Sequence, residues 1–169
     1  TPADLAGLEW RPARVPGTAA AAIGAGGRDF DAEDWWFRCT FTVPAGWAEH
    51  KLALELDGIA TVSEVFVDGD RVLGSTSMWE SHLVELSGPA GGPGEHQLAI
   101  ACRALKPLMG VRRRPPARWR TRVVNAGNLR WYRTMVFGRS PGFAPGPAPV
   151  GPWRPVRLVS LSEPGLESL

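Results

Sequence analysis

The chain contains 169 residues, of which 44% are hydrophobic and 21% are charged, and its net charge is +2. This composition excludes an intrinsically disordered chain, and no run reaches the roughly 18 apolar residues that a membrane-spanning helix requires. The length fits one globular domain. Because the first residue is Thr1 rather than Met and no signal-peptide pattern stands there, we expect a piece of a longer protein or a processed product.

Charged side chains are distributed unevenly along the chain. Residues 1–95 carry fifteen acidic and six basic side chains, whereas residues 96–162 carry thirteen basic and no acidic ones. Such asymmetry is typical of a partner surface, which here means nucleic acid, an acidic protein or another part of the same polypeptide.

The N-terminal region predicts loops followed by a strand. Residues 15–18 (Val-Pro-Gly-Thr) predict a turn, and residues 19–27 predict a loop of small residues. In residues 36–43 apolar and polar side chains alternate, which predicts a β-strand. The side chains expected on its apolar face are Phe37, Cys39, Phe41 and Val43.

The middle of the chain predicts a β-hairpin. After a strand at residues 51–56, the run at residues 63–67 turns at Asp68-Gly69 into residues 71–73. An Asp-Gly pair between two alternating apolar runs is the strongest short-range signal for antiparallel pairing. Further strands are predicted at residues 82–86, 96–102 and 156–161.

Short strands separated by Gly/Pro turns, without a convincing amphipathic helix, predict an all-β fold, either a β-sandwich or a jelly roll. Residues 1–169 are expected to form this single domain. The core is predicted to contain Phe37, Cys39, Phe41, Leu54, Leu56, Val65, Val67, Leu98 and Ile100.

The segment from residue 106 to residue 155 is predicted to be long and irregular. Residues 129–137 are interpreted as a short strand within it, and residues 138–152 as a loop that holds five of the sixteen prolines. Irregular segments of this length are generally functional or docked on something.

The two cysteines, Cys39 and Cys102, are predicted to be buried free thiols, although their spacing leaves a disulfide open. Two cysteines are too few for a Cys-rich zinc site, and the three histidines show no metal-ligand spacing. We therefore predict no metal and no cofactor.

An arginine-rich run is the strongest feature of the irregular segment, and three interpretations compete for it. Interleaved tryptophans fit nucleic acid, but Pro115-Pro116 excludes a recognition helix there and no nucleic-acid motif surrounds the run. A solvated loop is the second interpretation. Docking on a carboxylate-rich surface is favoured, because guanidinium pairs bidentately with carboxylates and tolerates burial. We thus expect neither a nucleic acid nor a membrane partner. The predicted docking residues are Arg112, Arg113, Arg114, Arg118, Arg120 and Arg122.

Eight tryptophans fit either a carbohydrate-binding platform or packing in the core. Packing is favoured for the four that lie in or beside strands, namely Trp35, Trp36, Trp79 and Trp153. For Trp119 and Trp131, which lie among arginines in the irregular segment, both interpretations stay open.

No catalytic residue is predicted. Retaining glycoside hydrolysis needs two carboxyl groups about 5–5.5 Å apart, and the acidic residues here are spread singly along predicted strands and turns. The chain contains no phosphate-binding glycine loop of the Walker kind.

The order and spacing of several short motifs resemble the N-terminal domain of glycoside hydrolase family 2, and within it the β-mannosidase branch. The resemblance covers nearly the whole chain. The motifs are Val15–Thr18, Asp34–Arg38, Leu54–Gly69, Ser77–His82, Gly94–Leu98 and Gly151–Val156.

This resemblance implies a galactose-binding-like jelly roll, the sugar-binding domain of these enzymes. In the family the domain packs on an immunoglobulin-like domain and a catalytic (β/α)8 barrel, and one of its loops helps to close the pocket over the sugar. The acid/base glutamate of the family follows an asparagine in the barrel, whereas Asn125 and Asn128 do not precede a glutamate here. The chain alone is therefore not expected to hydrolyse glycosides, although its parent protein is.

One loop departs from the family pattern. Mannosidases of this branch carry Phe-Gly-Trp-Asp-Trp-Gly-Pro where the loop meets the sugar, but here Phe137-Gly138 is followed by Arg139-Ser140-Pro141-Gly142-Phe143.

An accessory domain of a family 2 enzyme is the first hypothesis for the function. A free-standing carbohydrate-binding module and a basic interaction module are the alternatives. The candidate carbohydrate-binding residues are Trp119, Trp131, Arg139 and Phe143.

Overall fold

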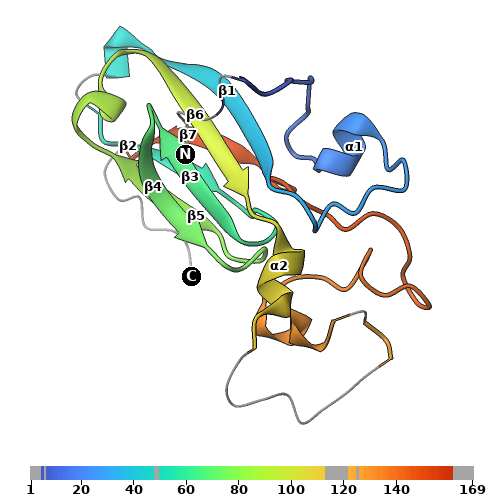
Figure 1. Ribbon diagram of the computed structural model, residues 1–169. Coiled ribbons are helices and arrows are strands. Elements are labelled where there is room, and N and C mark those ends of the chain that lie inside the picture. The colour runs from blue at the N-terminus through green and yellow to red at the C-terminus, as the bar shows by residue number, and fades with distance from the viewer. Residues whose placement is uncertain (1–4, 6, 48–49, 113–121, 125, 162–169) are drawn as a thin grey trace.

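The computed structural model describes residues 5, 7–47, 50–112, 122–124 and 126–161. Two antiparallel β-sheets pack face to face, and a short helix, α2 (Leu105–Gly110), lies at one end of them (Figure 1). This architecture confirms the all-β sandwich that the alternating apolar runs predicted. Among the described residues, no helix is long and apolar enough to cross a membrane.

The larger sheet contains four strands in the order β1-β6-β3-β4. Each of these four strands lies within one or two residues of its predicted place, and the Asp68-Gly69 turn joins β3 to β4. Both turn residues have positive φ, 52° at Asp68 and 93° at Gly69, as such a turn requires. The bounds are β1 (Trp35–Val43), β6 (Gly94–Cys102), β3 (Ser63–Val67) and β4 (Asp70–Ser75).

The smaller sheet contains three strands in the order β5-β2-β7. The central strand β2 pairs antiparallel with both neighbours, so that Leu54 lies opposite Val84 on β5 and Leu158 on β7. The last strand of the described chain thus returns to the sheet beside the second, as the sequence predicted. The bounds are β2 (Leu52–Leu56), β5 (His82–Leu86) and β7 (Val156–Ser160).

The core lies between the two sheets, and most of its predicted members are buried there. Phe37 and Phe41 are half-buried and pack against it. Burial of these apolar side chains is the main favourable term for the fold. The predicted core residues that are buried are Leu54, Leu56, Val65, Val67, Leu98 and Ile100.

The prediction that both cysteines are buried is wrong for Cys39, which is exposed, whereas Cys102 is buried. Both thiols are free, so no disulfide joins them. The reason is the position of β1 at the edge of the four-stranded sheet, opposite a sheet of only three strands. The inner side of β1 therefore opens into a cleft of about 1090 Å³ that Cys39 and Leu98 help to line.

Two predictions about regular structure are also wrong. Residues 19–27 contain the helix α1 (Ala19–Ile23), because Thr18 caps a run of alanines, the best helix former, by accepting a hydrogen bond from the Ala21 N–H. Residues 129–137 do not form a strand; the 3-10 helix η4 (Gly127–Trp131) occupies their start. The remaining elements are α2 (Leu105–Gly110), η2 (Ala45–Trp47) and η3 (Gly88–Gly91).

Candidate functional site

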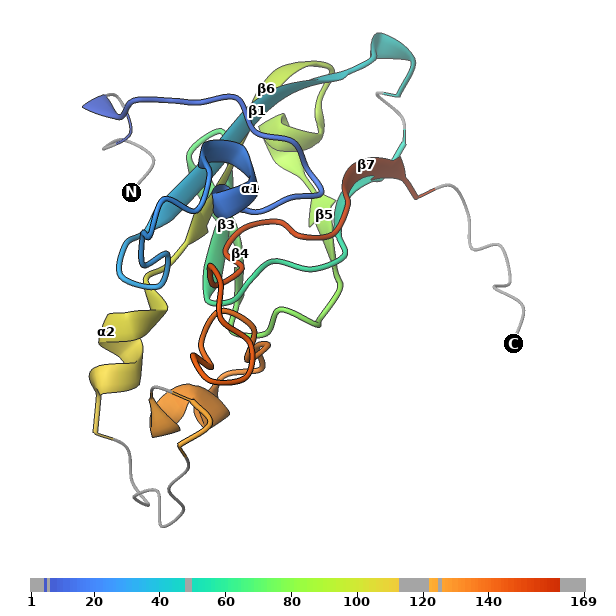
Figure 2. The same ribbon diagram turned by 90° about the vertical axis from the view of Figure 1, so that its right-hand side faces the viewer.

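One end of the sandwich gathers α2, η4 and the irregular segment that follows η4 (Figures 1 and 2). We call this region the α2 end, and we call residues 134–148 the end loop. A small apolar cluster of Leu105, Leu129 and Tyr132 joins α2 to η4. Asn128 strengthens the junction, because its Nδ2 donates to the carbonyl oxygen of Met109 at 2.7 Å.

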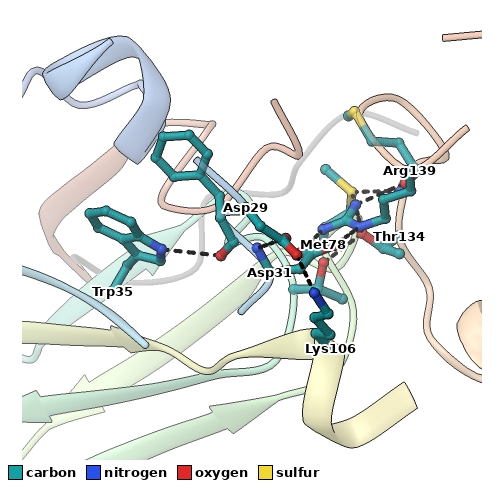
Figure 3. Close-up of polar contacts among 10 residues, drawn as sticks. Asp29, Asp31, Trp35, Met78, Lys106, Thr134 and Arg139 are labelled. Atoms are coloured by element: carbon teal, nitrogen blue, oxygen red, sulfur yellow. Dashed lines mark hydrogen bonds and ion pairs between the residues drawn. The ribbon is translucent and has the colours of Figure 1, made fainter. Parts of the chain in front are cut away.

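A buried ion pair attaches the end loop to the sandwich (Figure 3). Arg139 Nε lies 2.6 Å from Asp31 Oδ2, and Arg139 Nη2 lies 2.7 Å from Asp31 Oδ1. The side chains are only 4% and 7% exposed, respectively. Two parallel charge-assisted hydrogen bonds in this geometry are the strongest kind that a protein makes between side chains.

The third nitrogen of the Arg139 guanidinium binds the end loop itself. Nη1 donates to Thr134 Oγ1 at 3.2 Å and to the carbonyl oxygen of Met135 at 2.9 Å. Thr134 Oγ1 also lies 2.5 Å from Thr61 Oγ1 and 3.3 Å from the sulfur of Met78. A single side chain therefore connects two segments of the chain.

Asp31 is itself fixed by α2. Its carbonyl oxygen accepts from the Lys106 N–H at 2.8 Å, and its own N–H donates to Asp29 Oδ1 at 3.2 Å. The ammonium group of Lys106 closes the cluster by an ion pair of 2.7 Å with Asp29 Oδ2 (Figure 3). The loop before β1, the start of α2 and the end loop thus meet at one point.

The outer surface of the α2 end carries exposed aromatic side chains. Phe143 is 74% exposed, Phe137 is 59% exposed and Trp131 is 42% exposed. Arg130 lies over the Trp131 ring at 5.2 Å from its centroid. Exposed aromatic rings beside arginines are typical of surfaces that bind a partner.

Much of the charge asymmetry is neutralised inside the domain. Basic residues from the second half of the chain pair with acids from the first half: Arg103 with Asp34 and Glu64, and Arg157 with Glu55 and Asp57. Antiparallel pairing of early with late strands brings these groups together. Within the described part of the chain, the arginines without an ion pair are Arg14, Arg38, Arg112, Arg122, Arg130, Arg133 and Arg154.

The predicted docking residues are only partly described. Arg112 and Arg122 are described, but residues 113–121 between them lie outside the described residues. That segment contains Arg113, Arg114, Arg118, Trp119 and Arg120. Their docking and binding roles stay predictions.

Of the predicted carbohydrate-binding residues, Trp131 and Phe143 are exposed at the α2 end, whereas Arg139 is not. Every nitrogen of its guanidinium already has a partner within the protein. A sugar could reach it only by displacing Asp31, so a direct contact stays a prediction that this geometry does not favour. No pattern in the sequence indicates Asp31 as the partner of Arg139, because the two residues lie 108 positions apart.

The four tryptophans that were assigned to packing have partners in the fold. Trp35 Nε1 donates to the Phe30 carbonyl at 3.1 Å, and Trp153 Nε1 donates to the Met78 carbonyl at 2.9 Å. Trp36 packs on Phe66, and Trp79 meets Trp153 edge to face. Their role in packing is in keeping with these contacts.

A second cleft, of about 600 Å³, carries the charged residues Asp34, Glu64, Arg71 and Arg103. Both carboxylates accept hydrogen bonds from Arg103, and Glu64 also pairs with Arg71. Each acid is thus engaged by guanidinium, and neither is placed to exchange protons with a substrate. Among the described residues, no group of three His, Cys, Asp or Glu side chains could hold a metal ion.

The far end of the sandwich holds a different polar contact. His96 Nδ1 lies 2.7 Å from Asp68 Oδ2, and His96 Nε2 lies 2.9 Å from the carbonyl oxygen of Gly92. The hydrogen bond with Asp68, followed by that with Gly92, raises the pKa of His96. Burial opposes ionisation of Asp68, but hydrogen bonds from Gln97 and His96 outweigh it and lower its pKa.

Residues 26–154 match the model of a protein family described as "Glycosyl hydrolase 2 galactose-binding domain-like". β-Mannosidase B of Aspergillus terreus is 31% identical over 80 residues, which cover 44% of this chain and 10% of that protein. β-Mannosidase B of Aspergillus oryzae is 32% identical over 68 residues, covering 40% of this chain and 8% of that protein. The chain thus spans about a tenth of the length of these relatives.

Among solved structures, the β-D-mannosidase from Dictyoglomus thermophilum superposes with a TM-score of 0.64. The match covers 90% of this chain and 20% of that chain, with 23% sequence identity. An identity this low shows a shared fold. The family match and the superposition together confirm the galactose-binding-like jelly roll and the resemblance to family 2 that the motifs indicated.

Proposed function

Because the chain belongs to the glycosyl hydrolase 2 galactose-binding domain-like family, we propose that it is the non-catalytic N-terminal domain of a β-mannosidase-like glycoside hydrolase. In this proposal the α2 end packs against the catalytic domain of the same polypeptide, and the end loop helps to shape the pocket that receives the sugar. An immunoglobulin-like domain is the second proposed neighbour.

The observation that carries this proposal is the exposed aromatic surface on a firmly attached loop. Phe143 and Phe137 are more than half exposed, and the end loop that carries them is bound to the sandwich through the buried Arg139. Large apolar side chains that are exposed on a fixed backbone are typical of a surface that binds a partner, and a loop surrounded only by solvent does not need them. Arginines without an ion pair, such as Arg112 and Arg122, suit a partner surface that is rich in carboxylates.

The charged groups of the domain favour an accessory role over catalysis. The acids that line the smaller cleft, Asp34 and Glu64, are both engaged by Arg103. Glycosidases instead need one carboxyl group that holds a proton and a second that faces the sugar. We therefore assign hydrolysis to the neighbouring catalytic domain, and we place Phe143 and Trp131 near the mouth of its pocket.

The first test measures sugar binding by the isolated domain. Isothermal titration of the 169-residue chain with mannose and with β-1,4-linked mannobiose is expected to show no saturable heat, because the end loop would form only one wall of a pocket. Saturable binding with a dissociation constant in the micromolar to millimolar range would instead support the alternative, a free-standing carbohydrate-binding module. The exposed Phe143 and Trp131 rings are the observation that supports this alternative.

The second test measures turnover by the polypeptide that carries this domain beside its catalytic domain. Phe143→Ala is expected to lower kcat/KM for an aryl β-mannoside about tenfold, since misplacing a substrate-positioning group costs at least that much. Leu83→Ala is the matched control, because Leu83 is equally apolar and 57% exposed but lies on β5. Equal kcat/KM values for both variants would contradict a role for the end loop at the pocket.

Retention of the chain on immobilised DNA or heparin tests the remaining alternative, a basic interaction module. We expect elution below physiological salt, since phosphate contacts weaken steeply as counterions compete. Retention above that salt concentration would favour nucleic acid.

A further inference from the structure

The proposed function requires the end loop to have one fixed orientation, and resting on it we propose that the Asp31–Arg139 ion pair is a positioning clamp. The pair holds the end loop so that Phe137 and Phe143 face outward before any sugar or neighbouring domain arrives. Asp31 and Arg139 are thereby positioning residues: they act through the loop rather than by touching a ligand.

The geometry of the pair makes it directional. Both carboxylate oxygens of Asp31 accept from Arg139, at 2.6 Å and 2.7 Å. A bidentate pair fixes the plane and the direction of the guanidinium, whereas an apolar contact in the same place would let the side chain turn or slide. The pair can thus define an orientation as well as a distance.

Each partner of the pair is also held by hydrogen bonds to other residues. Arg139 Nη1 binds Thr134 and Met135 in the end loop, and Asp31 is tied to Lys106 at the start of α2 (Figure 3). The clamp therefore joins the end loop to two segments of the sandwich that are themselves anchored. Movement of the loop as a body would break both Arg139–Asp31 hydrogen bonds together with the contacts of Thr134 with Thr61 and Met78.

The end loop is closed on itself, so that its tip follows Arg139. Gly138 N–H donates to the Ala144 carbonyl at 2.9 Å, and Ala144 N–H donates to the Ser140 carbonyl at 2.7 Å. Gly138 has a φ of 75° and lies against the backbone of Ala148, which leaves no room for a Cβ atom at position 138. Because residues 138 and 144 are bonded to each other, fixing residue 139 also fixes Phe143.

Stability alone does not account for a buried pair of this kind. Apolar side chains of similar volume often stabilise a protein as well as a buried ion pair does, because two charges must lose their hydration on burial. What apolar replacements cannot supply is the fixed direction. A variant that removes both charges therefore separates the two roles.

The test compares three variants of the 169-residue chain. Asp31→Leu/Arg139→Met replaces both charges by apolar groups. Arg139→Lys keeps the positive charge but removes the planar guanidinium that binds both carboxylate oxygens. Arg157→Met is the matched control, since it removes an arginine that binds two carboxylate oxygens at 2.8 Å on the outer side of the smaller sheet. Thermal unfolding reports the stability of each variant.

Two readouts report the orientation of the loop. The first is the 19F spectrum of protein labelled with 4-fluorophenylalanine at its six phenylalanines, in which Phe143→Leu identifies the Phe143 resonance. The second is the rate of chymotrypsin cleavage after Phe143, measured by mass spectrometry. Cleavage of a folded chain requires the loop to open locally, so its rate follows the population of the open state.

The double variant is expected to melt close to the parent chain, yet to show a split or broadened Phe143 resonance and cleavage about tenfold faster. Arg139→Lys is expected to speed cleavage about threefold, because one hydrogen bond replaces two. Arg157→Met is expected to change neither readout. If the double variant does not fold, Arg139→Lys decides the question alone.

Unchanged cleavage and an unchanged Phe143 resonance in the double variant, or in Arg139→Lys if that is the variant that folds, would overturn the clamp. No sugar and no catalytic domain take part in these measurements. Failure of the clamp therefore leaves the docking role of the domain standing, whereas sugar binding by the isolated chain would contradict the docking role and leave the clamp standing.

Discussion

Between the two sheets, Leu54, Leu56 and Val65 are held by apolar contacts that recur at every second residue, whereas at the α2 end one buried ion pair joins segments 108 residues apart. In the sandwich the stabilising contacts are shared among many side chains, since each strand contributes several of them to the same core. At the α2 end the contacts are concentrated in one residue, because Arg139 binds Asp31, Thr134 and Met135 together. Damage to single residues should therefore have different consequences in the two regions.

The largest effect is expected from removing one partner of the ion pair. Arg139→Met leaves the Asp31 carboxylate buried without a counter-charge, which costs about 3–5 kcal/mol of unfolding free energy. Urea unfolding at neutral pH measures the loss. The second substitution Asp31→Leu is expected to restore most of the lost stability. A single variant as stable as the parent chain would show that the contacts at the α2 end are shared as widely as those in the sandwich.

In the sandwich, truncation of a fully buried leucine tests the apolar core. Leu56 has no exposed surface, and Leu56→Ala is expected to cost about 2–5 kcal/mol through lost burial and the cavity left behind. The exposed Leu83 provides the comparison, because Leu83→Ala should stay within about 0.5 kcal/mol of the parent chain. Equal losses at both positions would mean that β2 does not lie at the centre of the core.

A smaller effect is expected at the opposite end, where His96 holds the turn between β3 and β4. Its pKa is raised above the ordinary value of 6.5, so the stabilisation is fully present below pH 6.5 and is lost as pH rises through the raised pKa. The pKa of Asp68 is lowered, so its contribution is lost as pH falls from 3.8 toward and below that lowered pKa. The turn should thus be most stable in weakly acidic solution.

His96→Gln is expected to cost about 1–2 kcal/mol at pH 5.5 and less at pH 8.5, because the hydrogen bond to the charged imidazole is what it removes. Urea unfolding at both pH values measures the difference. His50→Gln is the control, since His50 is exposed and its ring nitrogen Nδ1 lies 2.7 Å from Ser160 Oγ. A loss that is the same at both pH values would exclude the charged form of His96.

The smallest effect concerns the open edge of the sandwich. One thiol should react quickly with an aromatic disulfide reagent in the folded chain, and two should react after unfolding. Cys39 is exposed beside the cleft, although partial burial raises its pKa, whereas complete burial raises the pKa of Cys102 to about 12. Reaction of neither thiol before unfolding would show that β1 is covered in solution.

The strands could be predicted from the sequence because their signal is local. Alternation of apolar residues and the Asp68-Gly69 turn depend on neighbours within a few positions, and the structure places all of the predicted strands except residues 129–137. That segment was apolar enough for a strand, but its pairing with the Ser77 segment is limited to a single bridge at Arg133, and Leu129 packs against α2. The exposure of Cys39 likewise depends on how many strands the opposite sheet contains.

The candidate site was predictable only in part, because the identity of an aromatic residue or an arginine does not indicate whether its side chain is buried or exposed. Phe143 and Trp131, two of the candidate carbohydrate-binding residues, are exposed, whereas Arg139, a third candidate, faces inward toward Asp31. Nothing near either residue in the sequence indicates the other.

The sequence by itself thus determined the all-β fold, the hairpin and the membership in family 2, since these depend on local periodicity and on the order of short motifs. Only the tertiary structure decided which charges meet, which cysteine is exposed and how the end loop is held. Ion pairs between distant segments form when folding brings them within a few ångströms, and that distance is a property of the packed sheets rather than of any stretch of residues.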